Sequence, residues 1–135
     1  MRLGIYRLGI YLALSAAAAV LGGCGGPSNG GGGCTPGASA AITIKSTGVS
    51  PTAVCVLPGG SVTFTNSDTV QQHEIVSDGT CPELDTGVLA QSGGTVTLVF
   101  PTAKTCAFHD SVNASNTAFQ GTVAVTSAPV SGPGY

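Results

Sequence analysis

The chain has 135 residues, of which only 7% are charged, and its formal net charge is −2. This length allows one domain of ordinary size, and the low, slightly acidic charge excludes the basic surface on which nucleic-acid binding depends. The many Thr, Ser, Val and Gly residues favour a β-sandwich over a helical bundle.

The N-terminus carries the pattern of a secretory signal. Arg2 and Arg7 form a positively charged start, and an apolar run follows from Leu8 to Leu21. The run is too short for a comfortable transmembrane helix, which needs about 20 apolar residues, and it has the length of a signal-peptide core. We expect cleavage and export, with an uncleaved membrane anchor as the alternative.

The signal ends in Leu21-Gly22-Gly23-Cys24, which resembles the lipobox of bacterial lipoproteins. The resemblance implies cleavage before Cys24 and acylation of its thiol and of its new amino group. Several acyl chains on one residue anchor a protein stably where a single chain does not. We therefore expect residues 1–23 to be the signal peptide, Cys24 to be the lipid anchor, and the lipid bilayer to be a partner. Gly25 replaces the Asp that marks inner-membrane retention in enteric lipoproteins, which favours the outer membrane where a cell has one.

A glycine-rich segment follows, at residues 24–37. It has too few apolar side chains to form a core, and we expect a flexible tether that leads to a domain at residues 38–127 and a flexible tail at residues 128–135. Without the signal, only Lys45 and Lys104 remain against six acidic residues. This balance argues further against nucleic acid and anionic lipid as partners.

The cysteines indicate an oxidising compartment. Apart from Cys24, the chain has an even number of them, and in an exported chain this predicts two disulfides with three possible pairings. These cysteines are Cys34, Cys55, Cys81 and Cys106.

Short alternating apolar runs between turn residues predict seven strands. Val62 and Phe64 share one face of such a run, and Val96, Leu98 and Phe100 face inward in another. Seven short strands of this kind predict an all-β sandwich, with room for a short helix at residues 112–118. The predicted strands span residues 41–45, 53–57 (ended by Pro58-Gly59-Gly60), 61–65, 73–76, 95–100, 105–110 and 122–126.

Two motifs resemble the cupredoxin family. The run VLPGGSVTFTNSD, followed by His73, is similar to the V-x-x-G-x-x-V-x-F-x-N-x-D run that precedes the first copper-ligand histidine of that family. The closing run FQGTVAV, at residues 119–125, is similar to the family's last strand. The resemblance implies a cupredoxin-like Greek-key sandwich of about seven strands, with copper as the cofactor and electron transfer as the function. The alternative is a metal-free binding or structural module that kept the sandwich and lost the copper site.

The chain departs from the family at the copper ligands. Cupredoxin sites use one Cys thiolate, two His and a weak axial ligand, usually Met. The chain's one Met is Met1, and the closing motif puts Phe119 at the axial position. The spacing Cys106-x-x-His109 is one that copper cupredoxins use, yet the family's ligand lies at the end of its strand and Cys106 lies at the beginning. The resemblance therefore puts Asp110 in the place of the thiolate.

The same resemblance implies a disulfide pairing. Cys106 and Cys81 would both lie at the pole opposite the copper end, which implies a Cys81–Cys106 disulfide and leaves Cys34–Cys55 as the second. Cys106 remains the alternative thiolate ligand if this register is wrong.

The candidate metal site consists of His73, His109 and Asp110, whose imidazole and carboxylate groups suit Cu(II) or Zn(II). Alternative interpretations are that His73 caps the core edge, that His109 is an ordinary surface histidine, and that Asp110 bonds backbone amides. Strand alternation places His109 on the face opposite Asp110. No hydrolase or phosphate-binding motif occurs, so we expect neither an enzyme nor catalytic residues, and the protein partner is unidentified.

Overall fold

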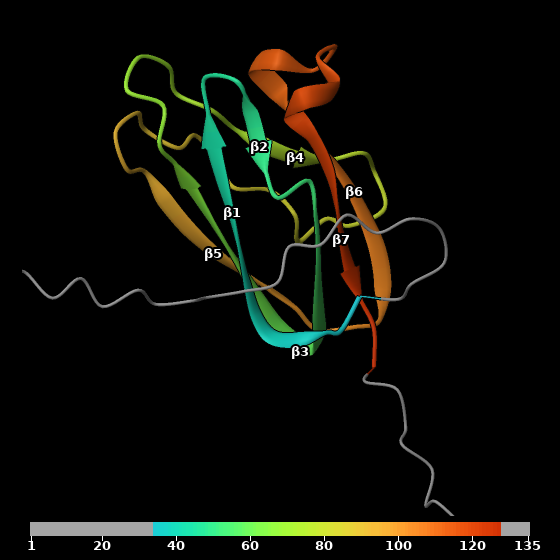
Figure 1. Cartoon of the computed structure of the whole chain (residues 1–135). Helices are drawn as coiled ribbons and strands as arrows, with labels where there is room; N and C mark the ends of the chain where they lie inside the picture. The colour runs from blue at the N-terminus through green and yellow to red at the C-terminus, as the bar shows by residue number, and fades with distance from the viewer. Residues whose placement is uncertain (1–33, 128–135) are drawn as a thin grey trace, which may run out of the picture. The chain divides into compact units, whose positions relative to one another are not determined.

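The computed structural model describes residues 34–127, whereas residues 1–33 and 128–135 lie outside the described part (Figure 1). The predicted signal peptide, Cys24 and the predicted C-terminal tail therefore fall outside it. Within residues 34–127 no helix is long and apolar enough to cross a membrane. The elements are β1 (Gly37–Lys45), β2 (Gly48–Ser50), β3 (Ala53–Asn66), β4 (Ile75–Ser77), β5 (Thr95–Phe100), β6 (Lys104–Asp110) and β7 (Gln120–Val125), with the 3-10 turns η1 (Ser111–Asn113) and η2 (Thr117–Phe119).

The strands form a two-layered sandwich in which β3 belongs to both layers. The hydrogen-bonded order is β2-β1-β3-β7-β6-β4, and β5 pairs with β3. Residues 53–56 of β3 run parallel to β7, while residues 60–65 pair with β5 in antiparallel register. Figure 1 shows β1, β3 and β5 on one side, facing β6 and β7 on the other. The predicted all-β sandwich is confirmed.

The strand count matches the prediction, but the strands are not the same ones. The predicted strands at residues 53–57 and 61–65 are one continuous strand, β3, and the predicted stop at Pro58-Gly59-Gly60 is wrong. Gly59 has a φ of 83°, which lets the chain bend there without ending its pairing. The short β2 was not predicted, because three residues are too few to show alternation. The region at residues 112–118, where the sequence left room for a short helix, contains parts of the two 3-10 turns η1 and η2.

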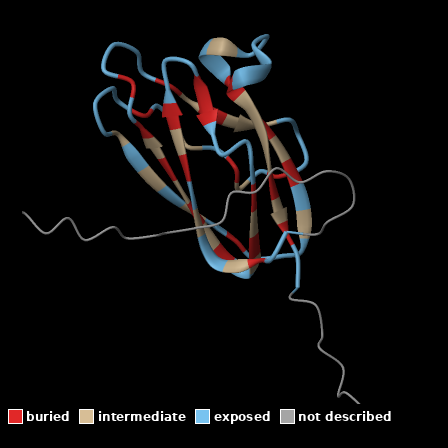
Figure 2. Ribbon diagram, in the orientation of Figure 1, coloured by how far each residue is buried: buried red, intermediate tan, exposed pale blue. Residues whose placement is uncertain are grey.

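The core lies between the two layers and follows the predicted alternation (Figure 2). Val62 and Phe64 are fully buried, and the rings of Phe64 and Phe108 meet edge to face with centroids 5.8 Å apart. Val96 and Leu98 are only partly buried and pack against the margin of this core. Burial of apolar side chains from both layers provides the main driving force for the fold.

Two disulfides connect strands β3 and β6 to neighbouring non-strand segments. Cys81 is bonded to Cys106 and Cys34 to Cys55, with Cα atoms 5.6 Å and 6.0 Å apart, and these pairs agree with the pairing that the resemblance implied. Cys34 lies in the segment predicted to be a tether, and β1 begins at Gly37, one residue before the predicted domain boundary. The Cys34–Cys55 bond therefore attaches the end of the predicted tether to β3.

Candidate functional site

His73 lies in the connection between β3 and β4. It is fully buried, and its backbone forms an isolated bridge with Leu89. The amide of His73 donates to the carbonyl of Leu89 at 3.1 Å, and the amide of Leu89 donates back at 2.7 Å. These two reciprocal backbone hydrogen bonds fix the position of the His73 backbone, from which the imidazole points into the interior.

Asp110 is the last residue of β6 and meets the ring of His73 from the other layer. Its Oδ2 accepts from Nδ1 of His73 at 2.7 Å and from Nδ2 of Asn113 at 2.7 Å. Its Oδ1 accepts from the amides of Glu74 at 3.1 Å and Val112 at 3.3 Å. The side chain is fully buried, and all its bonds are those of a carboxylate acting as an acceptor.

A second carboxylate, Asp68, lies on the opposite side of the same imidazole. Its Oδ2 is 3.4 Å from Nε2 of His73, and its Oδ1 accepts from the amides of Val70 at 2.8 Å and Gln71 at 3.2 Å. Both ring nitrogens of His73 therefore face carboxylate oxygens. The doubly protonated imidazolium is the form that can donate to both.

Asn66 organises the loop that carries Asp68 and His73. Its Nδ2 donates to the carbonyls of Gln71 at 2.9 Å and Leu89 at 3.0 Å, and its Oδ1 accepts from the amide of Asp68 at 2.9 Å. The side chain is fully buried. The side-chain amide of Asn66 thus connects Asp68 and Gln71 with Leu89, which lies in the segment between β4 and β5. This explains the role of an Asn at the end of β3.

Phe119 closes the site on one face. Its ring is stacked on that of His73, with centroids 5.5 Å apart and an interplanar angle of 24°, and it is almost completely buried. The sequence resemblance assigned Phe119 to the position of the axial copper ligand. An apolar ring here excludes water from the imidazole and supplies no electron pair for a metal.

The structure brings together two of the three predicted metal-site residues. His73 and Asp110 are bonded to each other, whereas His109 projects from the opposite face of β6 and pairs with Asp78. The side chains of His109 and Asp78 are 26% and 47% exposed, which makes this a surface pair. The prediction that His109 shares one site with His73 and Asp110 is therefore wrong. Adjacent residues of a strand point to opposite faces, so His109 and Asp110 cannot both face His73.

Cys106, the alternative thiolate ligand, lies near the start of β6 and is bonded to Cys81. Asp110 is four positions further along β6, which corresponds to roughly 13 Å along an extended strand. While the disulfide is intact, Cys106 has no thiolate to offer and lies at the far end of β6 from His73.

Hydrogen bonding keeps both carboxylates at the site ionised. Burial raises the pKa of Asp110, but bonds from Asn113, His73 and the amides of Glu74 and Val112 outweigh it and hold that pKa below its ordinary 3.8. For Asp68, the amide of Val70 is the largest cause of a lowered pKa; burial opposes it, and the Gln71 amide and His73 add to it. Both groups therefore carry negative charge at neutral pH.

The donor set does not fit a cupredoxin copper centre. Such a centre needs a thiolate and two imidazoles, and this site offers one imidazole, two carboxylates and a phenyl ring. No group of three or more His, Cys, Asp or Glu side chains within residues 34–127 is arranged to hold a metal ion. The 2.7 Å between Nδ1 of His73 and Oδ2 of Asp110 is a hydrogen-bond distance.

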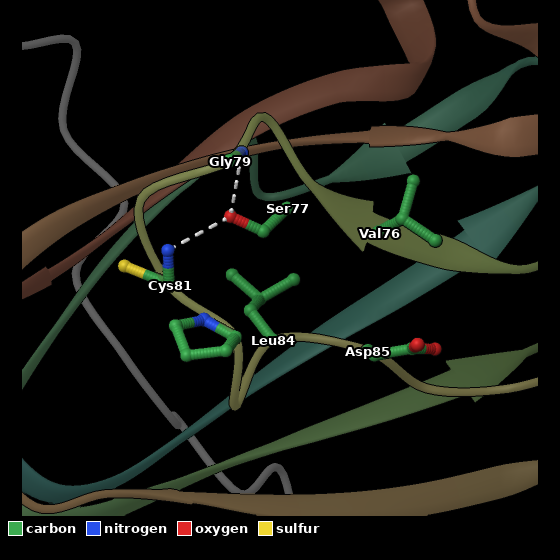
Figure 3. A pocket seen from close by; sticks show the side chains of 7 residues that line it. Val76, Ser77, Gly79, Cys81, Leu84 and Asp85 are labelled. Atoms are coloured by element: carbon green, nitrogen blue, oxygen red, sulfur yellow. Dashed lines mark hydrogen bonds between the residues drawn. The ribbon is translucent and has the colours of Figure 1, made fainter.

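A separate pocket of about 320 Å³ lies beside Cys81 (Figure 3). Within it, Oγ of Ser77 accepts from the amides of Gly79 at 3.2 Å and Cys81 at 3.1 Å. None of the predicted metal-site residues lines this pocket, which is therefore distinct from the buried cluster. Its lining residues are Val76, Ser77, Gly79, Cys81, Pro82, Leu84 and Asp85.

Sequence reasoning missed the roles of Asp68, Asn66 and Asn113. Asp68 and Asn66 belong to the N-x-D run that carried the family resemblance, yet neither was named as a candidate site residue. A carboxylate five residues before a buried histidine was the available signal. Asn113, three residues after Asp110, carried no comparable signal, because its contact depends on how η1 turns back over the end of β6.

The comparisons with known proteins bear on the fold. No family model matches the chain, and no curated protein matches it. The reduced Cu(I) form of an amicyanin mutant is similar with a TM-score of 0.56 and 18% identity over 65% of this chain and 82% of that chain. A purple cupredoxin from Nitrosopumilus maritimus gives 0.56 and 23% over 64% and 99%, and a reduced auracyanin from Roseiflexus castenholzii gives 0.54 and 20% over 67% and 98%. The described domain therefore has a cupredoxin-like fold, as the sequence motifs predicted.

Proposed function

We propose that the chain is an exported, lipid-anchored protein whose cupredoxin-like domain serves as a metal-free binding module. In this proposal a buried pair, His73 and Asp110, replaces the thiolate copper centre of the fold. The observation that carries it is the 2.7 Å hydrogen bond between Nδ1 of His73 and Oδ2 of Asp110. The proposed role is non-enzymatic, and the proposed partner is another protein of the cell envelope.

The hydrogen bonds of Asp110 support a structural role for this carboxylate. Both of its oxygens accept from two donors each, provided by His73, Asn113, Glu74 and Val112. Turning the carboxylate toward a metal would leave some of these buried donors unpaired, at about 1–3 kcal/mol for each unpaired group. This cost favours the closed hydrogen-bonded cluster over a metal-ligand set.

Export and anchoring are supported by different observations. Disulfides persist in oxidising compartments outside the cytoplasm, and the described domain contains two of them. The lipobox at Cys24 and the preceding apolar run favour a lipid anchor in the cell envelope. The outer membrane is the proposed location where the cell has one.

A second candidate function is the binding of Cu(II) or Zn(II) through nitrogen and oxygen ligands. It is favoured by the buried imidazole of His73 beside the carboxylate of Asp110, since both group types bind these metals. The similar solved structures include an amicyanin in its Cu(I) form and two further cupredoxins. On this alternative, the hydrogen bond between the two side chains would open to admit the ion.

A Cu(II) titration of the soluble chain from Gly25 onward separates the two candidates. We expect no sulfur-to-copper charge-transfer band, because no thiolate faces His73, and no rise in the midpoint of thermal unfolding. The second candidate predicts a rise that Asp110→Asn abolishes and that the matched surface variant His109→Gln leaves unchanged. An intense charge-transfer band would contradict both candidates and would favour a thiolate copper site with an electron-transfer function.

A further inference from the structure

We propose that the domain self-associates through the free edge of β5, with two copies pairing antiparallel about a two-fold axis at Thr97. Within the part of the chain that the structure describes, β5 pairs with β3 alone. The proposal does not involve the side chains of His73 and Asp110 and is independent of the proposed function.

The register identifies which backbone groups face the open edge. The amide of Asn66 donates to the carbonyl of Gly94 at 2.7 Å, and the ladder continues without a shift from Thr65 opposite Thr95 to Gly60 opposite Phe100. Backbone groups of successive residues in an antiparallel ladder point alternately to the two sides. The N–H and C=O groups directed away from β3 therefore belong to Thr95, Thr97 and Val99.

This edge lacks the devices that keep sheet edges from pairing. Natural edges are usually protected by charged side chains, by Pro, by a bulge or by being very short. β5 has six residues in an unbroken register, and residues 86–103 contain no charged side chain. Val99 is 56% exposed on its outer face. The strands at the ends of the main path, β2 and β4, have only three residues each.

A second copy fits this edge because the strand is self-complementary. An axis at Thr97 places each Thr97 opposite its equivalent and each Thr95 opposite Val99 of the second copy. The outward-directed N–H and C=O groups of Thr95, Thr97 and Val99 then each face a partner in the second copy, which gives about six inter-chain hydrogen bonds. On the core-facing side the partly buried Val96 meets Leu98 of the second copy, which extends the margin of the core. A two-fold axis brings identical residues close to each other. Because β5 carries no charged side chain, this does not place like charges side by side.

Cysteine cross-linking of the full chain, exported with its own N-terminus, tests this register. We expect Thr97→Cys to shift the chain from monomer to a disulfide-linked dimer on a non-reducing gel. Opposed Cα atoms of a hydrogen-bonded pair are about 5.5 Å apart, a separation that a disulfide spans. The matched variants Thr95→Cys and Val99→Cys should each run as uncross-linked chains on the same gel, because the two introduced cysteines of a dimer would then be roughly 13 Å apart.

The mixed pair provides a second, independent readout. Co-expression of Thr95→Cys chains with Val99→Cys chains should give a covalent heterodimer, and adding Thr97→Lys to both should abolish it by opposing two lysines at the axis. Absence of a dimer in both Thr97→Cys and the mixed pair overturns the proposal. Equal cross-linking of all three single variants overturns it as well, because random collision would then explain the products.

Discussion

The imidazole of His73 is held between two carboxylates, with Asp110 at Nδ1 and Asp68 at Nε2. A metal-ligating imidazole must leave one nitrogen lone pair for the ion, and the second nitrogen usually donates to a protein acceptor. Here both nitrogens face acceptors, and Phe119 covers one side of the ring. At the scale of single residues, a hydrogen bond to a carboxylate occupies the place that the family resemblance assigns to a metal–thiolate bond.

Asp110→Asn is expected to lower the free energy of unfolding by about 2–3 kcal/mol, because an amide nitrogen replaces a charged acceptor and leaves buried donors unpaired. Asp68→Asn should cost less, since its contact with His73 is the longer one, at 3.4 Å. Denaturant unfolding of the soluble chain measures both changes. The control His109→Gln should cost no more than about 1 kcal/mol, because it removes a single side-chain contact at the surface. Equal effects of Asp110→Asn and the control would rule out a structural role for the buried pair.

At the scale of elements, β6 connects the three parts of the domain that define its chemistry. Its inward-facing residues are Cys106, Phe108 and Asp110, all fully buried. Cys106 is bonded to Cys81, Phe108 packs against Phe64, and Asp110 bonds His73. Because side chains alternate along a strand, Cys106 and Asp110 lie on the same face of β6. The length of β6 keeps the disulfide and the histidine cluster apart.

The disulfide at the start of β6 leads to a prediction about thiols. We expect the oxidised soluble chain from Gly25 onward to contain no free thiol, and the double variant Cys81→Ala with Cys106→Ala to be less stable by about 2–4 kcal/mol. Maleimide labelling under denaturing conditions and denaturant unfolding measure the two quantities. As a control, Cys106→Ala alone should expose one labelled thiol, at Cys81. A labelled Cys106 in the unmodified chain would restore the thiolate alternative.

At the scale of the whole molecule, the histidine cluster links the two layers at one end of the sandwich. Asp68 follows β3, while Asp110 ends β6 in the other layer, and His73 bonds both. Both carboxylates have lowered pKa values in the folded state. Their ionised forms therefore stabilise the folded domain as a unit, and the stabilisation depends on pH.

The sign of this dependence follows from the direction of the shifts. A carboxyl group whose folded pKa lies below its unfolded value stabilises the protein above the unfolded pKa, and this contribution disappears as the pH falls through the folded pKa. We therefore expect the unfolding midpoint to fall as the pH drops below the ordinary value of 3.8. Thermal unfolding at stepwise lower pH measures it. Asp110→Asn should weaken the dependence, and an acid-independent midpoint would contradict the role of these carboxylates.

The parts of the fold that depend on local pattern were predictable. Alternation placed Val62 and Phe64 on a buried face and separated His109 from Asp110, and the structure has both features. The end of a strand was less predictable, because Pro58-Gly59-Gly60 reads locally as a turn. In the structure β3 continues through it, since β7 pairs with residues 53–56, β5 pairs with residues 60–65, and β1 pairs with β3 on both sides of the run.

The sequence by itself determined the all-β class and the facing of its strands, and its resemblance to the cupredoxins assigned Asp110 and Phe119 to the positions of copper ligands. The lipid anchor at Cys24 stays a prediction from the sequence. Only the tertiary structure decided that Asp68 joins the site, that Asn113 bonds Asp110, and that β5 has a free edge. Side-chain direction follows from the period of the backbone, whereas His73 and Asp110 are 37 residues apart and meet only when β4 and β6 pair. Contacts of that separation depend on the packing of the whole sandwich and on no local pattern.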